Sequence, residues 1–328
     1  VLQARFLREA KVAIKLRHRN LAQIYDFTVD DSGYAYLVME FIDGLNLQEV
    51  VKVLDKPGLG LVLEIARQSL EALGYLHRKR IIHRDVSPDN LLVTRDDEGA
   101  LLVKLIDLGI AKVRGGDDSL TSEGTFLGKV RYSSPEHFQT KEGSSVRAAS
   151  DLYSFGVVLY EMLTGMYPIK GTSVASLISG HLMHPPVDFS ESDPDGRVPA
   201  DLRQILEKAL DKDPEKRFGS SASFTKALEP WIAKHPLEAD EFQAIFDMPT
   251  LTTHKIRTLK KAGSTQSRID RSFGLSTTPP PGDTTDGDTE FETSGTVETG
   301  SAGRARSDAR EDSKQAQIRA LLIGAGKL

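Results

Sequence analysis

The chain of 328 residues contains no cysteine. This absence excludes disulfide bonds, zinc sites built from thiolates and a cysteine nucleophile. The chain also lacks any apolar run that approaches the roughly 18 residues of a membrane-spanning helix. Basic residues are not in excess, since 42 Lys and Arg face 47 Asp and Glu, so no basic footprint for nucleic acid or anionic lipid is present. These absences favour a cytoplasmic protein with one or two folded domains.

Neither end of the chain has a sequence pattern that defines it as a natural terminus. Val1 is neither an initiator methionine nor the start of a signal segment, so we expect the chain to be cut from a longer protein. At the other end, apolar residues return in 320–328. This segment either opens a further domain or is a frayed apolar end, and the sequence leaves both alternatives open.

Composition changes sharply in the last third of the chain. Residues 271–300 are rich in Ser, Thr and acidic residues and include three consecutive prolines at 279–281. Such a segment buries too little apolar surface to offset its chain entropy. We therefore predict that residues 236–328 form a low-complexity, mostly disordered tail.

Hydrophobic periodicity predicts a small sheet followed by a larger helical body. Residues 5–17 have a helical spacing, and two alternating runs at 21–29 and 34–41 flank a turn-forming segment, which is typical of a hairpin. An amphipathic pattern predicts a helix over 61–77. Further helical patterns lie at 151–164, 200–210 and 221–234. The order favours a two-lobed α+β fold.

The most informative residues lie in the segment His83–Asn90, with the sequence HRDVSPDN, and at Asp107, which opens DLG. An Asp and an Asn from two loops suit magnesium, a hard cation that prefers oxygen ligands. These segments resemble the H-R-D-x-x-x-x-N and D-F-G motifs of the protein kinase family. Three more blocks follow in the family's order: SPE at 134–136, Asp151 in SDLYSFGVVLYEMLTG, and Arg217 in DPEKRF.

The resemblance covers about residues 5–235 and implies a fold, cofactors and partners. The fold is a bilobal, protein-kinase-like α+β fold with an incomplete N-terminal sheet and a mainly helical C-lobe. Residues 1–40 would be a partial N-lobe, 41–235 the C-lobe and 236–328 the disordered tail. ATP and Mg2+ are the implied cofactors, and the implied partners are protein substrates and, for autophosphorylation, further copies of the chain. The HRDVSP sequence at 83–88, together with Gly128 and Lys129, resembles eukaryotic-like kinases of bacteria, especially myxobacterial types.

The resemblance also implies roles for individual residues. Asp85 is expected to be the base that orients the substrate hydroxyl, and Asn90 and Asp107 are expected to bind magnesium. Three residues are expected to support the site: Asp151 as the anchor of the HRD backbone, and Glu136 with Arg217 as a buried ion pair.

The segment Met39–Gly44 resembles the hinge between the two lobes. The backbones of Glu40 and Ile42 would then pair with the adenine edge, Asn46 would contact the ribose, and Leu92 would form the floor of the adenine site. A strand end followed by a turn gives much the same pattern, so this interpretation rests on the position of the segment between the other motifs.

A misleading motif lies near the start of the chain. The sequence VAIK ends at Lys15, but Lys15 lies only three residues before His18, where the family has a whole helix between its phosphate lysine and this turn. Glu9 fits the position of the helix glutamate instead. We therefore expect the glycine-rich loop and the phosphate lysine to precede Val1, so that the fragment is inactive alone. The alternative is a degenerate binding module that never had these strands.

Two departures from the family fall at positions that are linked in the family. Ser87 stands where serine/threonine kinases usually have a lysine, and Lys129 stands where they usually have a threonine. One hypothesis is a swap, in which Lys129 supplies the positive charge and Ser87 the hydroxyl. The alternative is neutral drift in a failing enzyme.

The loop between Asp107 and Glu136 carries hydroxyl residues that are candidate phosphorylation sites. Arg84, next to the catalytic aspartate, would bind a phosphate on this loop through a charge-assisted hydrogen bond. The candidate sites are Thr121, Ser122 and Thr125.

The leading interpretation is a serine/threonine protein kinase with activation-loop autophosphorylation. The alternative from a different class is a pseudokinase scaffold that binds partners without phosphoryl transfer, but the presence of Asp85, Asn90 and Asp107 disfavours it. A small-molecule phosphotransferase is disfavoured by the SPE segment and Arg217, which such enzymes generally lack.

Overall fold

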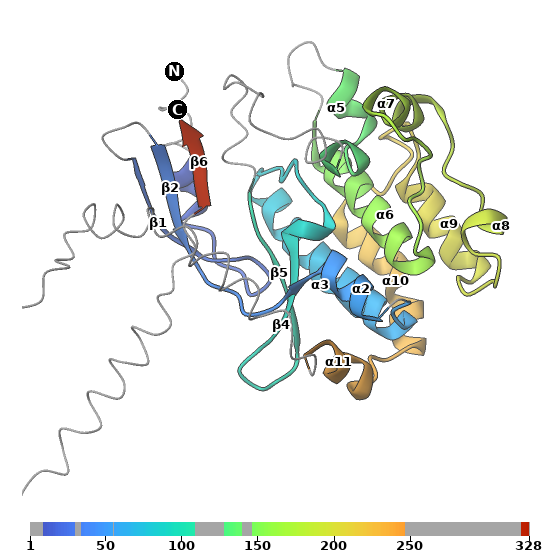
Figure 1. The fold of residues 1–328 in the computed structure, drawn as a ribbon, viewed down its shortest axis with the longest axis horizontal. Coiled ribbons are helices and arrows are strands. Elements are labelled where there is room, and N and C mark those ends of the chain that lie inside the picture. Colours follow the sequence, from blue (N-terminus) through green and yellow to red (C-terminus); the bar gives the residue numbers. More distant parts are fainter. Residues whose placement is uncertain are drawn as a thin grey trace, which may run out of the picture. The chain divides into compact units, whose positions relative to one another are not determined.

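A computed structural model describes residues 9–29, 34–54, 56–108, 128–139, 146–246 and 323–327, all in one compact unit (Figure 1). The predicted hairpin is confirmed: β1 (Ile24–Val29) pairs antiparallel with β2 (Tyr34–Met39). Residues 9–13 are helical and pack against the hairpin through a small apolar cluster. The cluster consists of Ala10, Ala13, Ile24, Leu37 and Met39.

Residues 323–327 form a strand on this hairpin, a pairing that neither alternative for 320–328 included. Strand β6 (Ile323–Lys327) pairs antiparallel with β2 and makes the sheet order β1-β2-β6 (Figure 1). The sequence could not indicate this, because backbone pairing between residues some 290 positions apart leaves no local pattern.

A second sheet carries the segments that flank the site. Its order is β3 (Leu45–Asn46), β4 (Leu91–Arg95) and β5 (Leu101–Leu105), all antiparallel. One face of β4 and β5 turns into the main core, where Val93 and Val103 are fully buried. The opposite face of these strands carries Leu92 and Lys104. Both are half-buried, so this face is open to a ligand.

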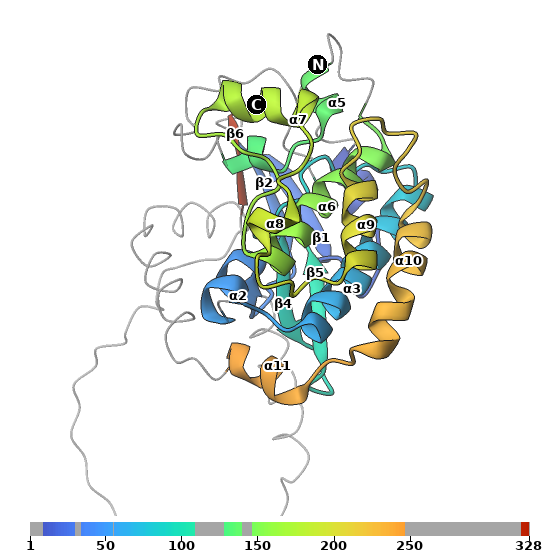
Figure 2. The ribbon, with the colours of Figure 1, turned by 90° about the vertical axis from the view of Figure 1, so that its right-hand side faces the viewer.

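The other regular elements of the described chain are helices. The long helices α3 (Leu59–Arg78) and α6 (Ala148–Thr164) pack together in the core, and α10 (Ser221–Lys234) lies along α3 (Figure 2). Helix α6 is buried on nearly every side, which explains its almost continuous apolar sequence. Between residues 47 and 209, the structure also describes α2 (Leu47–Leu54), α5 (Pro135–Gln139), α7 (Val174–Met183), α8 (Phe189–Ser192), α9 (Ala200–Ala209) and the 3-10 turn η1 (Pro88–Asn90).

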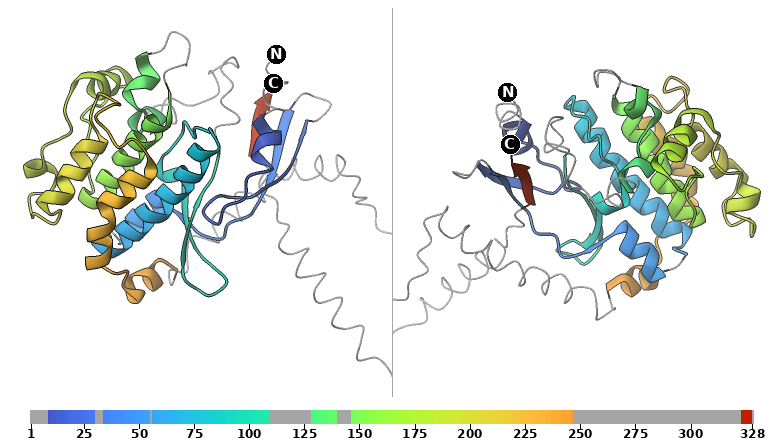
Figure 3. Two further views of the ribbon diagram at one scale, coloured as in Figure 1. Left: turned by 180° about the vertical axis from the view of Figure 1, so that it is seen from behind. Right: turned by 45° about the horizontal axis from the view of Figure 1, so that its top comes forward.

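The folded region extends beyond residue 235, where the sequence predicts its end. Helix α11 (Ala239–Phe246) contacts α2 and buries Phe242 and Ile245 in the main core (Figure 3). The guanidinium of Arg95, at the end of β4, lies 4.5 Å from the ring centre of Phe246. Residues 236–246 therefore belong to the folded domain, while 247–322 of the predicted tail lie outside the described residues.

No helix within the described ranges is long and apolar enough to cross a membrane.

Candidate active site

The loop that contains the HRD sequence is held by one buried carboxylate. Asp151 of α6 is 1% exposed and accepts hydrogen bonds from the backbone N–H groups of His83 and Arg84, each 2.9 Å long. His77 of α3 lies 2.8 Å from the same carboxylate through Nε2. Because three elements meet at Asp151, the backbone just before Asp85 is fixed by buried contacts.

The two ends of this loop are joined by Asn90. Its Nδ2 donates a 2.7 Å hydrogen bond to the carbonyl oxygen of Asp85. Since the amide nitrogen is used in this way, the side-chain Oδ1 of Asn90 is the atom left to face a cation. The backbone carbonyl of Asn90 accepts a 2.9 Å hydrogen bond from the N–H of Ile106, the residue before Asp107.

The His83 side chain also links this loop to Ile106. The side chain is fully buried, and its Nδ1 accepts from the N–H of Asp85 at 3.3 Å. The proton therefore lies on Nε2, which donates to the carbonyl oxygen of Ile106 at 3.0 Å. These contacts hold the loop that carries Asp85 and Asn90 next to the backbone that leads to Asp107.

Backbone strain concentrates here. Arg84 has φ = 65° and Asp107 has φ = 57°, in the left-handed region that non-glycine residues rarely adopt. Arg84 directly precedes the predicted base Asp85, and Asp107 is itself a predicted magnesium ligand. Strain of this kind persists where buried contacts hold it in place. The oxygen chemistry of Asn90 and Asp107 fits Mg2+ with nucleotide phosphates as further ligands. Within the described ranges, no group of three or more His, Asp or Glu side chains forms a separate metal site.

The predicted hinge leaves specific backbone groups for a ligand. The N–H of Glu40 donates to the carbonyl of Gln23 at 2.7 Å, so the carbonyl of Glu40 is the group that a ligand would contact. Asn46 caps α2, where its Oδ1 accepts from the N–H of Glu49 and the Glu49 carboxylate accepts from the N–H of Asn46, both at 2.9 Å. Its Oδ1 is therefore engaged in the fold, and its ribose contact stays a prediction.

The other residues that the sequence assigns to the nucleotide site lie on the second sheet, in the hinge and on the N-terminal helix. Leu92 is half-buried and pairs with Asn46 across the second sheet, and Ile42 is half-buried in the hinge. Glu9 lies at the start of the helical residues 9–13. Lys15 is exposed in the turn that ends this helix, so it lies on no strand.

Glu136 and Arg217 form a buried, fully hydrogen-bonded pair. Arg217 Nη2 lies 2.7 Å from Glu136 Oε1 and its Nη1 lies 3.2 Å from Oε2. The other guanidinium N–H groups donate to the carbonyls of Asp211, Lys212 and Ala149. Although burial alone would raise the pKa of Glu136, the hydrogen bonds from Arg217 lower it.

A neighbouring buried histidine makes the stability of this region depend on pH. Tyr153 lies over the Arg217 guanidinium and contacts Nδ1 of His181 at 3.0 Å, while Lys212 donates to the Tyr153 hydroxyl at 3.2 Å. Burial, together with the charges of Lys212 and His137, lowers the pKa of His181 to about 4, which the nearby backbone of Val130 and Arg131 only partly offsets.

We expect the free energy of unfolding to fall by about 2 kcal/mol between pH 7 and pH 5 on account of His181. The unfolded chain binds a proton near pH 6.5, whereas the folded chain does not until about pH 4, so stability is lost as the pH falls through this window. Urea unfolding of His181→Gln should show this part of the loss removed, and His184→Gln, at an exposed position, should not. Equal pH slopes in the wild type and His181→Gln would contradict the prediction.

Ser87 and Lys129 are not joined in the structure. Ser87 is half-buried and Lys129 is exposed, and no hydrogen bond between them occurs among the described residues. The Arg84 guanidinium is exposed. The candidate phosphorylation sites Thr121, Ser122 and Thr125 lie outside the described residues.

Comparisons with known proteins agree with this geometry. A family model described as "Protein kinase domain" matches residues 2–232. The chain belongs to the protein kinase family. The serine/threonine-protein kinase pkn3 of Myxococcus xanthus is 34% identical over 229 residues, which cover 69% of this chain and 41% of the relative. PknB of Mycobacterium leprae is 34% identical over 238 residues, covering 72% of this chain and 37% of the relative.

Solved kinase structures share the fold. Rad53 1–466 in complex with AMP-PNP has a TM-score of 0.56 at 30% identity, covering 70% of this chain and 54% of that chain. The PknI kinase domain of Mycobacterium tuberculosis has a TM-score of 0.52 at 27% identity, covering 70% and 79%. The chain spans about two fifths or less of the length of the two curated relatives.

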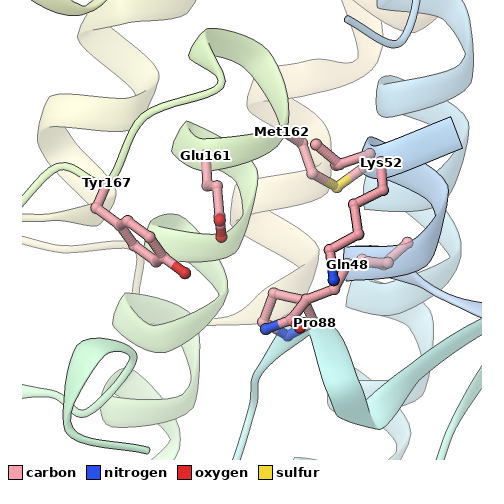
Figure 4. Close-up of a pocket in the computed structure, with 8 residues that line it drawn as sticks. Gln48, Lys52, Pro88, Glu161, Met162 and Tyr167 are labelled. Carbon is pink, nitrogen blue, oxygen red and sulfur yellow. The ribbon is translucent and has the colours of Figure 1, made fainter. Parts of the chain in front are cut away.

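One cavity beside the loop that contains the HRD sequence was not anticipated from the sequence. Gln48 and Lys52 of α2 face Glu161 and Tyr167 across it, and Pro88 lies at its side (Figure 4). Burial raises the pKa of Glu161, although the hydroxyl of Tyr132 donates to its carboxylate at 2.6 Å. No motif in the sequence indicates this cavity, because its lining residues come from three separate segments, at 47–52, 88 and 161–167.

Proposed function

We propose that this chain carries the phosphoryl-transfer site of a serine/threonine protein kinase that uses ATP and Mg2+. The observation that carries the proposal is the pair of hydrogen bonds made by Asn90, one to Asp85 and one from Ile106, which bring the two motif segments together. The names of the curated relatives support serine and threonine as acceptors.

Each residue then has one task. When bound, ATP would supply the phosphoryl group and Mg2+ would neutralise part of the negative charge on it. Asp85 accepts the proton of the substrate hydroxyl and orients its oxygen. Asn90 Oδ1 and the Asp107 carboxylate would hold the cation, and the carbonyl of Glu40 with the backbone of Ile42 would hold the adenine edge. Asp151 and His83 keep these groups in place through buried hydrogen bonds.

We also propose that the kinase acts on proteins in the cytoplasm and phosphorylates its own activation loop at Thr121, Ser122 or Thr125, with copies of the chain acting on one another. The test is intact mass after incubation with magnesium and ATP, on residues 1–328 and, in parallel, on the whole protein that the gene encodes. A gain of phosphate that Asp107→Asn abolishes supports the proposal. Nucleotide binding without any phosphate gain, on itself or on a general protein substrate, would favour the pseudokinase scaffold instead.

We propose that Lys129 delivers positive charge to the transferring phosphate and that Ser87 supplies the paired hydroxyl. Lys129→Thr should then lower kcat about 10²-fold, as the loss of one charge-stabilising group does in other enzymes. Ser87→Lys should also impair the enzyme, because two ammonium groups then compete for one position. The double variant Ser87→Lys/Lys129→Thr should recover to within about tenfold of the wild type in steady-state kinetics. A double variant as inactive as the worse single variant would indicate neutral drift.

A further inference from the structure

The hinge segment 40–46 is attached to the second sheet at its far end. Asn46 pairs with Leu92 of β4, and the Thr94 hydroxyl donates a 2.6 Å hydrogen bond to the carbonyl of Asp43. These contacts come from one strand, so the end of the segment that leads into α2 is fixed relative to β4.

Gly44 strengthens this attachment. Its backbone lies so close to the carbonyl oxygen of Val93 that a Cβ atom could not be accommodated. A glycine at this position therefore allows the hinge to approach β4 more closely than any other residue would.

Lys104 lies in line with these contacts. It pairs opposite Leu92, which itself pairs opposite Asn46, so the three residues form one line across the sheet. Directly opposed residues place their side chains on the same face. The neighbours of Lys104 on β5, Val103 and Leu105, turn into the core, so Lys104 and Leu92 share the face that looks away from it.

The ammonium of Lys104 reaches back to Glu40, the first residue of the segment. Its Nζ lies 2.7 Å from Oε1 and 3.0 Å from Oε2 of the carboxylate. Oε2 also accepts a 2.9 Å hydrogen bond from the N–H of Gln23. The side chains of Lys104 and Glu40 are only 13% and 25% exposed, so water screens this pair less than it screens a surface pair.

We propose that Lys104 is a positioning residue for nucleotide binding, an inference that rests on the proposed kinase function. One end of segment 40–46 is tied to Leu92 through Asn46, and the other is tied through Glu40 to the residue opposite Leu92. Lys104 thereby fixes the distance between the hinge backbone and the Leu92 side chain, which are the two sides of the predicted adenine site. It also lies three residues before Asp107, so the same contact connects the hinge to the strand that leads to the metal-binding loop.

The test compares Lys104→Met with Lys104→Arg in the full-length protein. We expect Lys104→Met to raise the KM for ATP and the Kd for ADP about five- to tenfold, with kcat within about twofold, as for lost ground-state binding. Lys104→Arg keeps the charge and should return both constants to within about threefold of the wild type. The KM for the protein substrate should stay unchanged in both variants.

A second readout needs no nucleotide. The N–H of Glu40 is bonded to the Gln23 carbonyl, so its hydrogen exchange should be faster in Lys104→Met than in the wild type or Lys104→Arg. Lys170→Met is the matched control, because it removes a lysine from the exposed pair with Glu191, 2.6 Å apart, and should change neither exchange nor KM.

The outcomes separate the two proposals. If the wild type binds ADP and Lys104→Met shows unchanged KM, Kd and Glu40 exchange, the role of Lys104 is wrong and the kinase function stands. Equal losses of kcat and melting temperature in the Met and Arg variants would mean general damage and would also overturn it. If the wild type neither binds nucleotide nor transfers phosphate, the proposed function fails, and the role of Lys104 fails with it.

Discussion

Asp85→Asn is expected to lower kcat for phosphoryl transfer about 10³-fold, within the range typical of a lost general base. Asparagine has nearly the same size as aspartate but cannot accept the hydroxyl proton. The contacts that hold this loop use the backbone of Asp85, whose N–H donates to His83 and whose carbonyl accepts from Asn90. They survive the substitution, so we expect the loss in kcat to come without a loss of fold.

The measurement is single-turnover transfer by the full-length protein to a serine- or threonine-containing substrate, with ADP affinity determined in parallel. ADP affinity should change less than about threefold, since Asp85 acts on the acceptor hydroxyl rather than on the nucleotide. Asp89→Asn is the control, because it removes an exposed carboxylate from the same loop and should retain most of the activity. If Asp85→Asn kept more than a tenth of wild-type kcat, Asp85 could not be the base.

Arg217→Met is expected to reduce the free energy of unfolding by about 3–5 kcal/mol, because it leaves the Glu136 carboxylate buried without its cation. The Arg217 side chain is fully buried, and all five of its guanidinium N–H groups have acceptors. Arg217→Lys should also destabilise the fold, by about 2 kcal/mol, because an ammonium group cannot reach all of these acceptors.

Urea unfolding at pH 7 would measure both effects, and Glu136→Gln/Arg217→Met tests the cause. With the stranded charge removed, the double variant should be more stable than Arg217→Met alone. The direction of the pH dependence also follows. Because folding lowers the pKa of Glu136, the pair contributes to the free energy of unfolding above about pH 4.5, and this contribution is lost as the pH falls further. A cost below 1 kcal/mol for Arg217→Met would contradict the prediction.

Local patterns predicted much of the fold. Alternation over 21–29 and 34–41 predicted the hairpin, and the helical spacing over 61–77 predicted α3 to within two residues at its start and one at its end. Both signals come from residues close in sequence, so no knowledge of the rest of the chain was needed. The short helix α11 was missed because what stabilises it is the burial of Phe242 and Ile245 against distant segments.

The sequence by itself determined the family, the order of the elements and the residue types available for chemistry at 85, 90 and 107, because motif spacing and periodicity are local properties of the chain. Only the tertiary structure decided the orientation of Asn90 and the ion pair between Lys104 and Glu40. It also decided the position of the Glu161 carboxylate beside a cavity and the pairing of β6 with β2. Each of these depends on groups far apart in sequence, and such groups acquire a fixed distance only when burial and hydrogen bonding bring their segments together.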